Sequence, residues 1–317
     1  MSNNYFEILR PGINTTIQDC GRNHMYHEGI TVSGAIDQRN FKLANKLVNN
    51  SLNEAVIEFA YQGPHLKLKN SKINFSVTGD VIFKIIRNNS KVESGICYKN
   101  YILEEEDQLD IISTKNTAYG YLSVNGGFQL EKFWDSYSIN TKANIGPNKG
   151  KKYSIEDKIF IKDSDLKKIK ETELNYSRSL DNTIRVIEGT NFDYFSKEAQ
   201  NILFNQEFYV TKLADRMGIR LSGYKLENVV STNIKSEGLV RGVIQVPADG
   251  NPIIMLSDHG TIGGYPKIGV VISADLDRVG QLTPASNINF KKVSLEEAEN
   301  IFKAYTHDTN IYINECN

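Results

Sequence analysis

Short runs of apolar and β-branched residues, separated by turns that contain glycine, recur along most of this chain. Runs of this length and composition are typical of β-strands. We expect strands at 54–60, 73–77, 81–86, 108–113, 118–124, 208–211, 242–246, 253–256, 268–273 and 288–293. The pattern predicts a mainly β protein whose strands close into barrels.

A few short helices are expected between these strands. Asp37 can cap a helix whose apolar residues at 41, 44, 47 and 48 fall on one face. Ser294 and Glu297 form a capping box ahead of apolar residues at helical spacing over 298–305. A third helix is predicted at 192–200.

The length of 317 residues predicts two domains. The segment 162–181 is charged and poor in apolar residues, as expected of a linker or an exposed hairpin. We therefore predict an N-terminal barrel at 1–180 and a C-terminal barrel of similar topology at 181–317.

Composition narrows the classes of function. A formal net charge of −1 gives no basic footprint for nucleic acid, and three cysteines are too few for a disulfide framework. The N-terminus lacks an apolar signal core, and no apolar run approaches transmembrane length. We expect a cytoplasmic protein that binds a small molecule, with no role for nucleic acid or membrane.

The segment 236–280 concentrates polar side chains in a glycine-rich loop between strands. Glycines let backbone approach a ligand, and loops carried by strands commonly hold functional residues. Lys267 supplies a cation, Tyr265 a hydroxyl, Gln245 an amide and Glu237 a carboxylate. The alternative is that Tyr265 and the following proline form only a packing corner.

Two further segments are candidates. Asp215 and Arg216 lie in the segment TKLADRMGIRLSG. An arginine can bind a carboxylate or phosphate through two parallel hydrogen bonds. The alternative is an internal ion pair between Asp215 and Arg216. The N-terminal loop carries Gln18, Asp19 and Ser33, and here the alternative is an Asp–Arg pair that fixes the loop. Metal ligands are not expected, because the Cys and His residues at 20, 24 and 27 lack a fourth partner of matching spacing.

Several linked motifs resemble one family. They are PGINTTIQDCGR, ITVSGAIDQRNFKLANKLVNN, SVTGD, YLSVNGGF, ADRMGIRLSG, SEGLVRGVIQVPADGNPI and TIGGYPKIGVVISADL, in this order. Together they resemble the carboxyltransferase-domain family, also called allophanate hydrolase subunit 2. This family includes the C subunit of the bacterial 5-oxoprolinase complex, the Kip-type antagonist of a kinase inhibitor, and the carboxyltransferase domain of urea amidolyase.

The resemblance implies two cyclophilin-like β-barrel domains with a site in the cleft between them. By motif it implies a site formed by Asp215, Arg216, Gln245, Tyr265 and Lys267, faced by the TTIQD and SGAID segments. Where most members have Gly-Ser-Arg-Ser-Thr, this chain reads DSYSI at 135–139, so the arginine and threonine of that loop are missing.

The function implied by the resemblance is that of the C subunit in an ATP-dependent 5-oxoprolinase complex, which converts 5-oxoproline to L-glutamate. Subunits A and B are the implied partners, the second of them most directly, and ATP acts through the complex. No motif for covalent biotin attachment occurs in the chain. A regulatory antagonist of a kinase-inhibitor protein and a biotin-dependent carboxyltransferase subunit remain alternatives.

Within the first hypothesis we assign roles from chemistry. Lys267 and Arg216 neutralise phosphate charge, and Asp215 orients water or acts as a base. Tyr265 is placed with the catalytic residues because its hydroxyl follows the same Gly-Gly turn. One small polar substrate can use all of these groups only if Asp215, Gln245, Tyr265 and Lys267 gather around one cavity, so we expect them to converge.

Overall fold

The chain divides into two units whose segments are interleaved in sequence. In a computed structural model that describes residues 3–163, 166, 170–177 and 181–316, unit 1 comprises 1–22, 33–177 and 309–317, and unit 2 comprises 23–32 and 178–308. The main transition, between 177 and 178, lies close to the predicted boundary near 180. The domain bounds 1–180 and 181–317 stay a prediction, and the predicted linker at 162–181 lies partly outside the described residues.

Unit 1 contains two β-sheets rather than a closed barrel. The six-stranded sheet has the order β11 (Lys158–Phe160), β1 (Tyr5–Arg10), β4 (His65–Lys69), β9 (Gln108–Thr114), β6 (Val81–Ile86) and β7 (Val92–Ser94). The five-stranded sheet has the order β2 (Thr16–Gln18), β3 (Val56–Ala60), β10 (Tyr119–Val124), β5 (Ile73–Thr78) and β8 (Asn100–Leu103).

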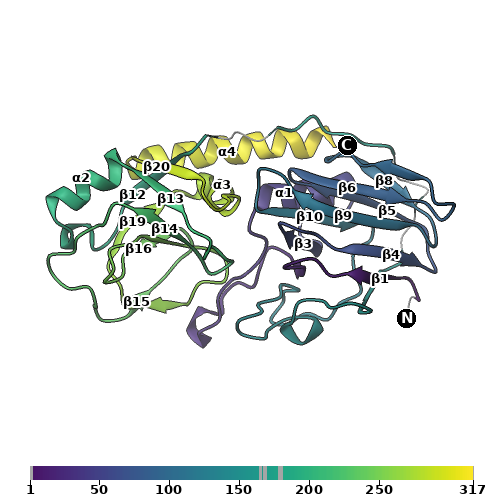
Figure 1. Cartoon of the computed structure of the whole chain (residues 1–317), viewed down its shortest axis with the longest axis horizontal. Helices are drawn as coiled ribbons and strands as arrows, with labels where there is room; N and C mark the ends of the chain where they lie inside the picture. The colour runs from purple at the N-terminus through teal and green to yellow at the C-terminus, as the bar shows by residue number, and fades with distance from the viewer. Residues whose placement is uncertain (1–2, 164–165, 167–169, 178–180, 317) are drawn as a thin grey trace. The chain divides into compact units, whose positions relative to one another are not determined.

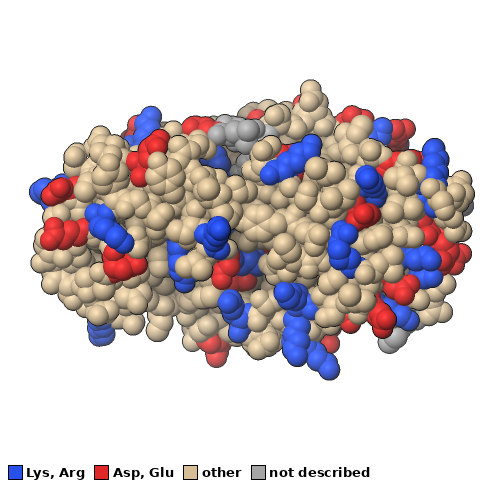
Figure 2. All heavy atoms as spheres, in the orientation of Figure 1, with Lys and Arg blue, Asp and Glu red and all other residues tan. Residues whose placement is uncertain are grey.

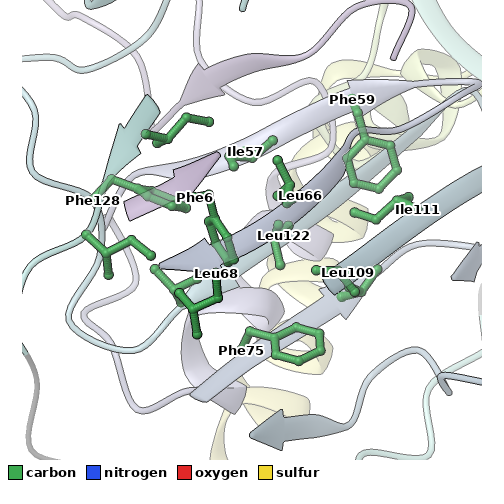
Figure 3. Packing of buried hydrophobic residues seen from close by; sticks show 14 of the residues in the cluster. Phe6, Ile57, Phe59, Leu66, Leu68, Phe75, Leu109, Ile111, Leu122 and Phe128 are labelled. Atoms are coloured by element: carbon green, nitrogen blue, oxygen red, sulfur yellow. The ribbon is translucent and has the colours of Figure 1, made fainter. Parts of the chain in front are cut away.

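The core of unit 1 contains side chains from both sheets (Figure 3). Strands β1, β4 and β9 alternate buried and partly exposed positions, whereas β3, β5 and β10 are buried throughout. The second pattern arises because helix α1 (Gln38–Leu47) packs on the five-stranded sheet. Ser76 and Thr78 donate hydrogen bonds of 2.7 and 2.8 Å to α1 carbonyl oxygens, which satisfies polar groups on this buried face.

Unit 2 forms a closed seven-stranded barrel (Figure 1). Its strand order is β12 (Thr183–Glu188), β19 (Lys267–Val271), β16 (Val243–Gln245), β17 (Ile253–Met255), β14 (Gly218–Gly223), β13 (Glu207–Val210) and β20 (Asn287–Lys292). A separate two-stranded sheet pairs β15 (Glu237–Gly238) with β18 (Ile262–Gly263). The mainly β class is confirmed, and each of the ten predicted strands has a counterpart in the structure.

The helices show where the sequence was informative. Asp37 caps α1 by accepting a 3.0 Å hydrogen bond from the Asn40 amide, as predicted. The prediction of one helix at 192–200 is wrong in its bounds. That region contains the 3-10 helix η4 (Phe192–Tyr194) and then α2 (Lys197–Asn205), which Ser196 caps. The remaining short helices are α3 (Leu276–Gly280) and the 3-10 helices η1 (Tyr26–Glu28), η2 (Asn148–Gly150) and η5 (Ser273–Asp275).

The last helix corrects the expectation that all helices are short, because α4 runs for 21 residues over Leu295–Glu315. Ser294 and Glu297 form the predicted capping box, with reciprocal hydrogen bonds of 3.1 and 2.7 Å. In its first part Tyr305 donates to Asp277 in unit 2. Its last turns belong to unit 1, where Tyr312 meets Tyr176 with ring centroids 5.0 Å apart.

The described residues include no helix that is long and apolar enough to span a membrane. On the face shown in Figure 2, lysine and arginine side chains are interspersed with aspartate and glutamate. This mixture agrees with the near-zero net charge of the sequence.

We expect Phe75→Ala to destabilise unit 1 by about 3–5 kcal/mol, because it removes a fully buried ring from the core. The Phe75 ring contacts the rings of Phe83 and Tyr101, with centroids 6.4 and 5.7 Å away. Urea unfolding followed by fluorescence of Trp134, the single tryptophan, reports on unit 1. Ile82→Ala is the control, since Ile82 is 40% exposed on a neighbouring core strand. Equal losses for the two variants would contradict this assignment of the core.

Candidate functional site

Two neighbouring strands of the unit 2 barrel place Gln245 and Lys267 side by side. β16 and β19 are antiparallel, and Gln245 and Lys267 are direct partners across them, so both side chains lie on one face. A register shift between Ile244 and Gln245 occurs at this point. Irregularities of this kind re-aim side chains and are common next to functional sites.

Lys267 places a cation in a buried position. Its side chain is only 5% exposed, and its ammonium forms an ion pair with the carboxylate of Glu237, whose side chain is 46% exposed. Glu237 comes from β15, outside the barrel sheet. A buried ammonium without a counter-charge would be costly, so this contact stabilises the observed arrangement.

The amide of Gln245 is fixed beside the same small sheet. Its Nε2 donates a 3.0 Å hydrogen bond to the carbonyl oxygen of Tyr265. Gly263, the strand partner of Glu237, contacts this amide closely, because a Cβ atom at 263 would lie 2.7 Å from Nε2. The absence of a side chain at 263 therefore lets the Gln245 amide and the β15–β18 sheet approach each other.

Asn191 anchors the backbone at Lys267 and was not among the predicted residues. Its side-chain Oδ1 accepts a 3.0 Å hydrogen bond from the backbone N–H of Lys267, and its backbone N–H donates a 3.2 Å hydrogen bond to the backbone carbonyl oxygen of Lys267. Asn191 is 5% exposed and follows Gly189 and Thr190 after β12. No local sequence signal marks it, because its partner lies 76 positions away.

We call Glu237, Gln245, Tyr265, Lys267 and Asn191 the Lys267 cluster. The cluster retains unused hydrogen-bonding capacity. Among the described residues, Glu237 is the only partner of the Lys267 ammonium, which has three N–H donors. Neither the Gln245 Oε1 atom nor the Tyr265 hydroxyl has a hydrogen-bond partner within the described ranges. A small polar ligand could therefore find an anion-binding group and an acceptor on one face of the barrel, where Gln245 and Lys267 are strand partners.

Asp215 does not join this cluster, which corrects the expectation that it converges with Lys267, Gln245 and Tyr265. Strands β14, β17, β16 and β19 pair in this order. One end of this ladder is formed by Arg220, Ile253, Gln245 and Lys267. The other end is formed by Gly218, Met255, Val243 and Val270. Asp215 precedes Gly218 and accepts hydrogen bonds from the amides of Met217 and Gly218 at 2.9 and 3.3 Å. It therefore lies beyond the end of the ladder that is opposite to Lys267.

Arg216 lies at the same end as Asp215 and binds an acid from a distant segment. Its guanidinium donates two hydrogen bonds to Asp258, of 2.8 Å from Nε and 3.1 Å from one terminal nitrogen. The two side chains are only 6% and 3% exposed. The sequence did not indicate this partner, which lies 42 positions away. Such a buried, two-point pair fixes both backbone segments and leaves less of the guanidinium for a ligand.

His259 and Tyr26 form a second feature that the predicted site omitted. The His259 Nδ1 atom lies 2.6 Å from the Gly260 carbonyl oxygen, which can only accept, so Nδ1 carries the proton. Nε2 is then the acceptor for the Tyr26 hydroxyl at 3.2 Å. Burial lowers the pKa of His259 and raises the pKa of Tyr26. The result is a neutral imidazole held next to the Arg216–Asp258 pair.

The predicted residues of the N-terminal loop belong to unit 1 and are structurally engaged. Asp19 is 3% exposed and accepts hydrogen bonds from Gly21, Ser136, Tyr137 and Ser138 at 2.5–2.8 Å. Gln18 donates to Thr16 and to the carbonyl of Ile139. These contacts show that the DSYSI segment at 135–139 supports Asp19. Hydroxyl and amide groups hold the Asp19 carboxylate, where the predicted alternative was a pair with arginine.

Ser33 has a positive φ of 56° and is the first residue of unit 1 after the segment 23–32, which belongs to unit 2. Its hydroxyl accepts a 3.2 Å hydrogen bond from Asn140. The two stretches of chain that flank this segment are joined by a 2.9 Å hydrogen bond from the Ala35 backbone N–H to the Asp19 carbonyl oxygen. Gly34 permits this closure, since its φ is 82° and a Cβ atom there would lie 2.9 Å from the Cys20 backbone.

Metal ligation has no geometric support in the described part of the chain. No group of three or more His, Cys, Asp and Glu side chains is arranged there to hold an ion. The chemistry available at the two ends of the unit 2 ladder is that of hydrogen bonds, charge and an imidazole.

Comparison with known proteins identifies the wider group to which the chain is similar. The family model described as carboxyltransferase domain, subdomain A and B, matches residues 28–292. The chain is 32% identical to the 5-oxoprolinase C subunit of Haemophilus influenzae over 293 residues, covering 92% of each protein. It is 29% identical to the 5-oxoprolinase C subunit of Escherichia coli over 296 residues, again covering 92% of each.

Solved structures show the same backbone arrangement within a larger protein. The structure of Kluyveromyces lactis urea amidolyase matches 97% of this chain with a TM-score of 0.87 and 26% sequence identity. The matched part makes up 20% of that protein, so this chain is similar to one portion of it.

We expect His259 to contribute to the loss of stability as the pH falls. Because burial holds its pKa below the ordinary value of 6.5, the unfolded state binds more protons over the interval between the two values. Stability present above the unfolded pKa is therefore lost as the pH drops through this interval. Thermal unfolding between about pH 7.5 and 5, the range in which histidine titrates, should show a smaller decline for His259→Gln than for the wild type.

His27→Gln is the matched control, because the His27 side chain is 71% exposed. Identical pH profiles for His259→Gln and the wild type would show that the buried imidazole is not the titrating group.

Proposed function

Since this chain belongs to the carboxyltransferase domain family, we propose that it is the C subunit of an ATP-dependent 5-oxoprolinase complex that hydrolyses 5-oxoproline to L-glutamate. The observation that carries this proposal is the identity of 32% and 29% to two proteins of that name, over nearly the full length of both partners. Subunits A and B are the proposed partners, the second of them in direct contact with this chain.

The reaction needs activation because a lactam carbonyl is a poor electrophile. In the proposed sequence, the lactam oxygen attacks the γ-phosphorus of ATP and ADP leaves. Water then adds to the activated carbon and the ring C–N bond breaks, which gives the acyl phosphate of glutamate. A second water hydrolyses this acyl phosphate to glutamate and phosphate. A protein assists such chemistry mainly by positioning its reactants and neutralising charge. The proposed complex supplies the nucleotide-binding groups.

We assign substrate recognition to the Lys267 cluster. Lys267 supplies a positive charge in a buried position, where electrostatic interactions are stronger than in water. Gln245 is held in place by the Tyr265 carbonyl, and the exposed Tyr265 hydroxyl remains available. Glu237 completes the charge balance of the ligand-free site.

The other predicted residues receive different proposed roles. Arg216 is a positioning residue, because Asp258 already binds its guanidinium at two points. Asp215 is kept as a proposed base only for a step at its own end of the barrel, since the ladder separates it from Lys267. Gln18, Asp19 and Ser33 shape the loop that carries Tyr26, and His259 becomes an additional candidate base.

A carboxyltransferase subunit that acts with a separate biotin carrier is the second candidate. The observation that favours it is the TM-score of 0.87 to urea amidolyase. Copurification with a biotinylated protein, followed by transfer of its carboxyl group to urea, would support this function. A regulatory antagonist would instead bind its inhibitor partner with no turnover in any combination of subunits.

We expect the isolated chain to form no glutamate from 5-oxoproline and ATP, because its proposed complex requires subunits A and B. Co-expression with both partners should give ATP-dependent glutamate formation, measured by release of labelled glutamate together with ADP. Omission of each partner in turn is the control. A complete, folded complex without turnover would contradict the proposed function, and turnover by the pure chain would contradict the need for partners.

We expect Lys267→Ala to reduce turnover of the assembled complex by a factor on the order of 100 or more, as for removal of a group that stabilises charge at a reacting centre. Lys292→Ala is the matched control. Lys292 also pairs with a glutamate on the same barrel, but its side chain is 56% exposed. Circular dichroism and partner pull-down verify folding and assembly. Equal activity of the two variants per folded complex would return Lys267 to a structural role.

A further inference from the structure

The Lys267–Glu237 pair is markedly asymmetric. The lysine side chain is 5% exposed and the glutamate side chain is 46% exposed. The pair between Lys292 and Glu188 on the same barrel lacks this contrast, since these side chains are 56% and 40% exposed. The buried cation is therefore neutralised by an acid that solvent reaches.

The element that carries Glu237 is small. β15 and β18 contain two residues each and form a sheet of their own, outside the barrel ladder. The segment from 227 to 238, which leads to this strand, is exposed at most positions. A segment with few buried apolar contacts opens locally at a lower free-energy cost than barrel strands do. Glu237 can therefore leave Lys267 without disruption of the barrel.

We propose that Glu237 occupies the position of the ligand's own anionic group, so that it competes with the ligand for Lys267 and is displaced when the ligand binds. This inference rests on the proposed function, and it adds a built-in competitor that sets the affinity of the site. Two carboxylates cannot share one buried ammonium at little cost, because the second adds an uncompensated negative charge. Exchange of one carboxylate for the other keeps the site neutral.

The remaining groups of the cluster define the chemical class of ligand. The free Oε1 atom of Gln245 accepts the N–H of an amide, while the Lys267 ammonium binds a carboxylate on the same molecule. These two groups match a small cyclic amide that bears a carboxylate. A neutral amide such as urea has no group that could take the place of Glu237.

Competition has a measurable consequence. As long as Glu237 covers Lys267, only the fraction of molecules with a displaced glutamate is ready to bind, and the apparent affinity is reduced by that fraction. Replacement by glutamine keeps the size of the side chain and removes its charge. Affinity for the carboxylate ligand should then increase.

The test is calorimetric titration of the full chain, alone and in the assembled complex, with 5-oxoproline. We expect Glu237→Gln to bind more tightly than the wild type by a factor on the order of ten, the effect of one modest charge interaction. Glu188→Gln, which disrupts the exposed pair on the same barrel, should bind like the wild type. Tighter binding should disappear in the double variant Glu237→Gln/Lys267→Met.

Two analogues separate the contributions of the ligand's groups. 2-Pyrrolidinone lacks the carboxylate, so the wild type and Glu237→Gln should bind it equally. N-methylated 5-oxoproline lacks the N–H, so it should bind weakly to both proteins while keeping the difference between them. Weaker binding of 5-oxoproline by Glu237→Gln than by the wild type would overturn the proposal, because Glu237 would then be a ligand contact. The absence of 5-oxoproline binding in all variants would overturn it as well.

A measurement on the unmodified protein covers the case in which the variant fails to fold. In a structure of the wild type with 5-oxoproline, the Glu237 carboxylate should lie away from Lys267, with the ligand's carboxylate in its place. An intact Lys267–Glu237 pair beside a bound ligand would refute displacement. Turnover by the complex is measured in a separate experiment. If Glu237 is not displaced but the complex forms glutamate, only this inference is wrong. If the complete complex forms no glutamate, the proposed function is wrong whatever Glu237 does.

Discussion

A buried ammonium group must keep a counter-charge, and this requirement connects the barrel of unit 2 to the small sheet beside it. Lys267 begins a barrel strand and is almost completely buried, while Glu237 reaches it from the separate β15–β18 sheet. Because Gly263 has no side chain, that sheet can lie close to the Gln245 amide. Lys267 and Gln245 thus come from strands of the barrel, and Glu237 comes from a small separate sheet that contacts Lys267 through an ion pair.

The charges of three candidate residues in this protein are stabilised in three different ways. Asp19 is satisfied by short hydrogen bonds within unit 1, and Arg216 by a buried two-point pair with Asp258. Both arrangements have buried partners, so they fix loops in position. Lys267 differs because its partner is exposed to solvent. This difference in exposure is the basis for our proposal that Glu237 can be exchanged for the anionic group of a ligand, and it separates the Lys267 cluster from the two buried arrangements.

The family scaffold is shared by proteins named for different reactions, so the fold alone does not decide the chemistry. We propose that in this chain the distinction depends on which ligand groups the Lys267 cluster can satisfy. Under this proposal a lactam with a carboxylate would use the cation and the amide acceptor together, whereas a neutral urea molecule would use only the hydrogen-bonding groups. His259 lies at the other end of the ladder, where burial lowers its pKa and favours the neutral imidazole, and it provides a second chemical function within the same barrel.

The sequence by itself determined the local features of this protein. Alternating and apolar runs located the strands, and the Asp37 cap and the Ser294–Glu297 box located two helix starts, because these signals act between neighbouring residues. It also grouped Glu237, Gln245, Tyr265 and Lys267, which lie within one short stretch of chain. The length of α4 was missed because the stretch at 306–310 is polar in sequence, and because the turns after it are stabilised by Tyr176 from a distant segment.

Only the tertiary structure decided which of these groups meet. Strand register placed Asp215 beyond the end of the ladder opposite to Lys267, and a one-dimensional pattern does not specify register between strands that are distant in sequence. Long-range pairing brought Arg216 to Asp258, and joined His259 to Tyr26 across 233 positions. Closing a long loop is repaid only when the whole barrel forms, so such contacts are properties of the fold and not of any segment within it.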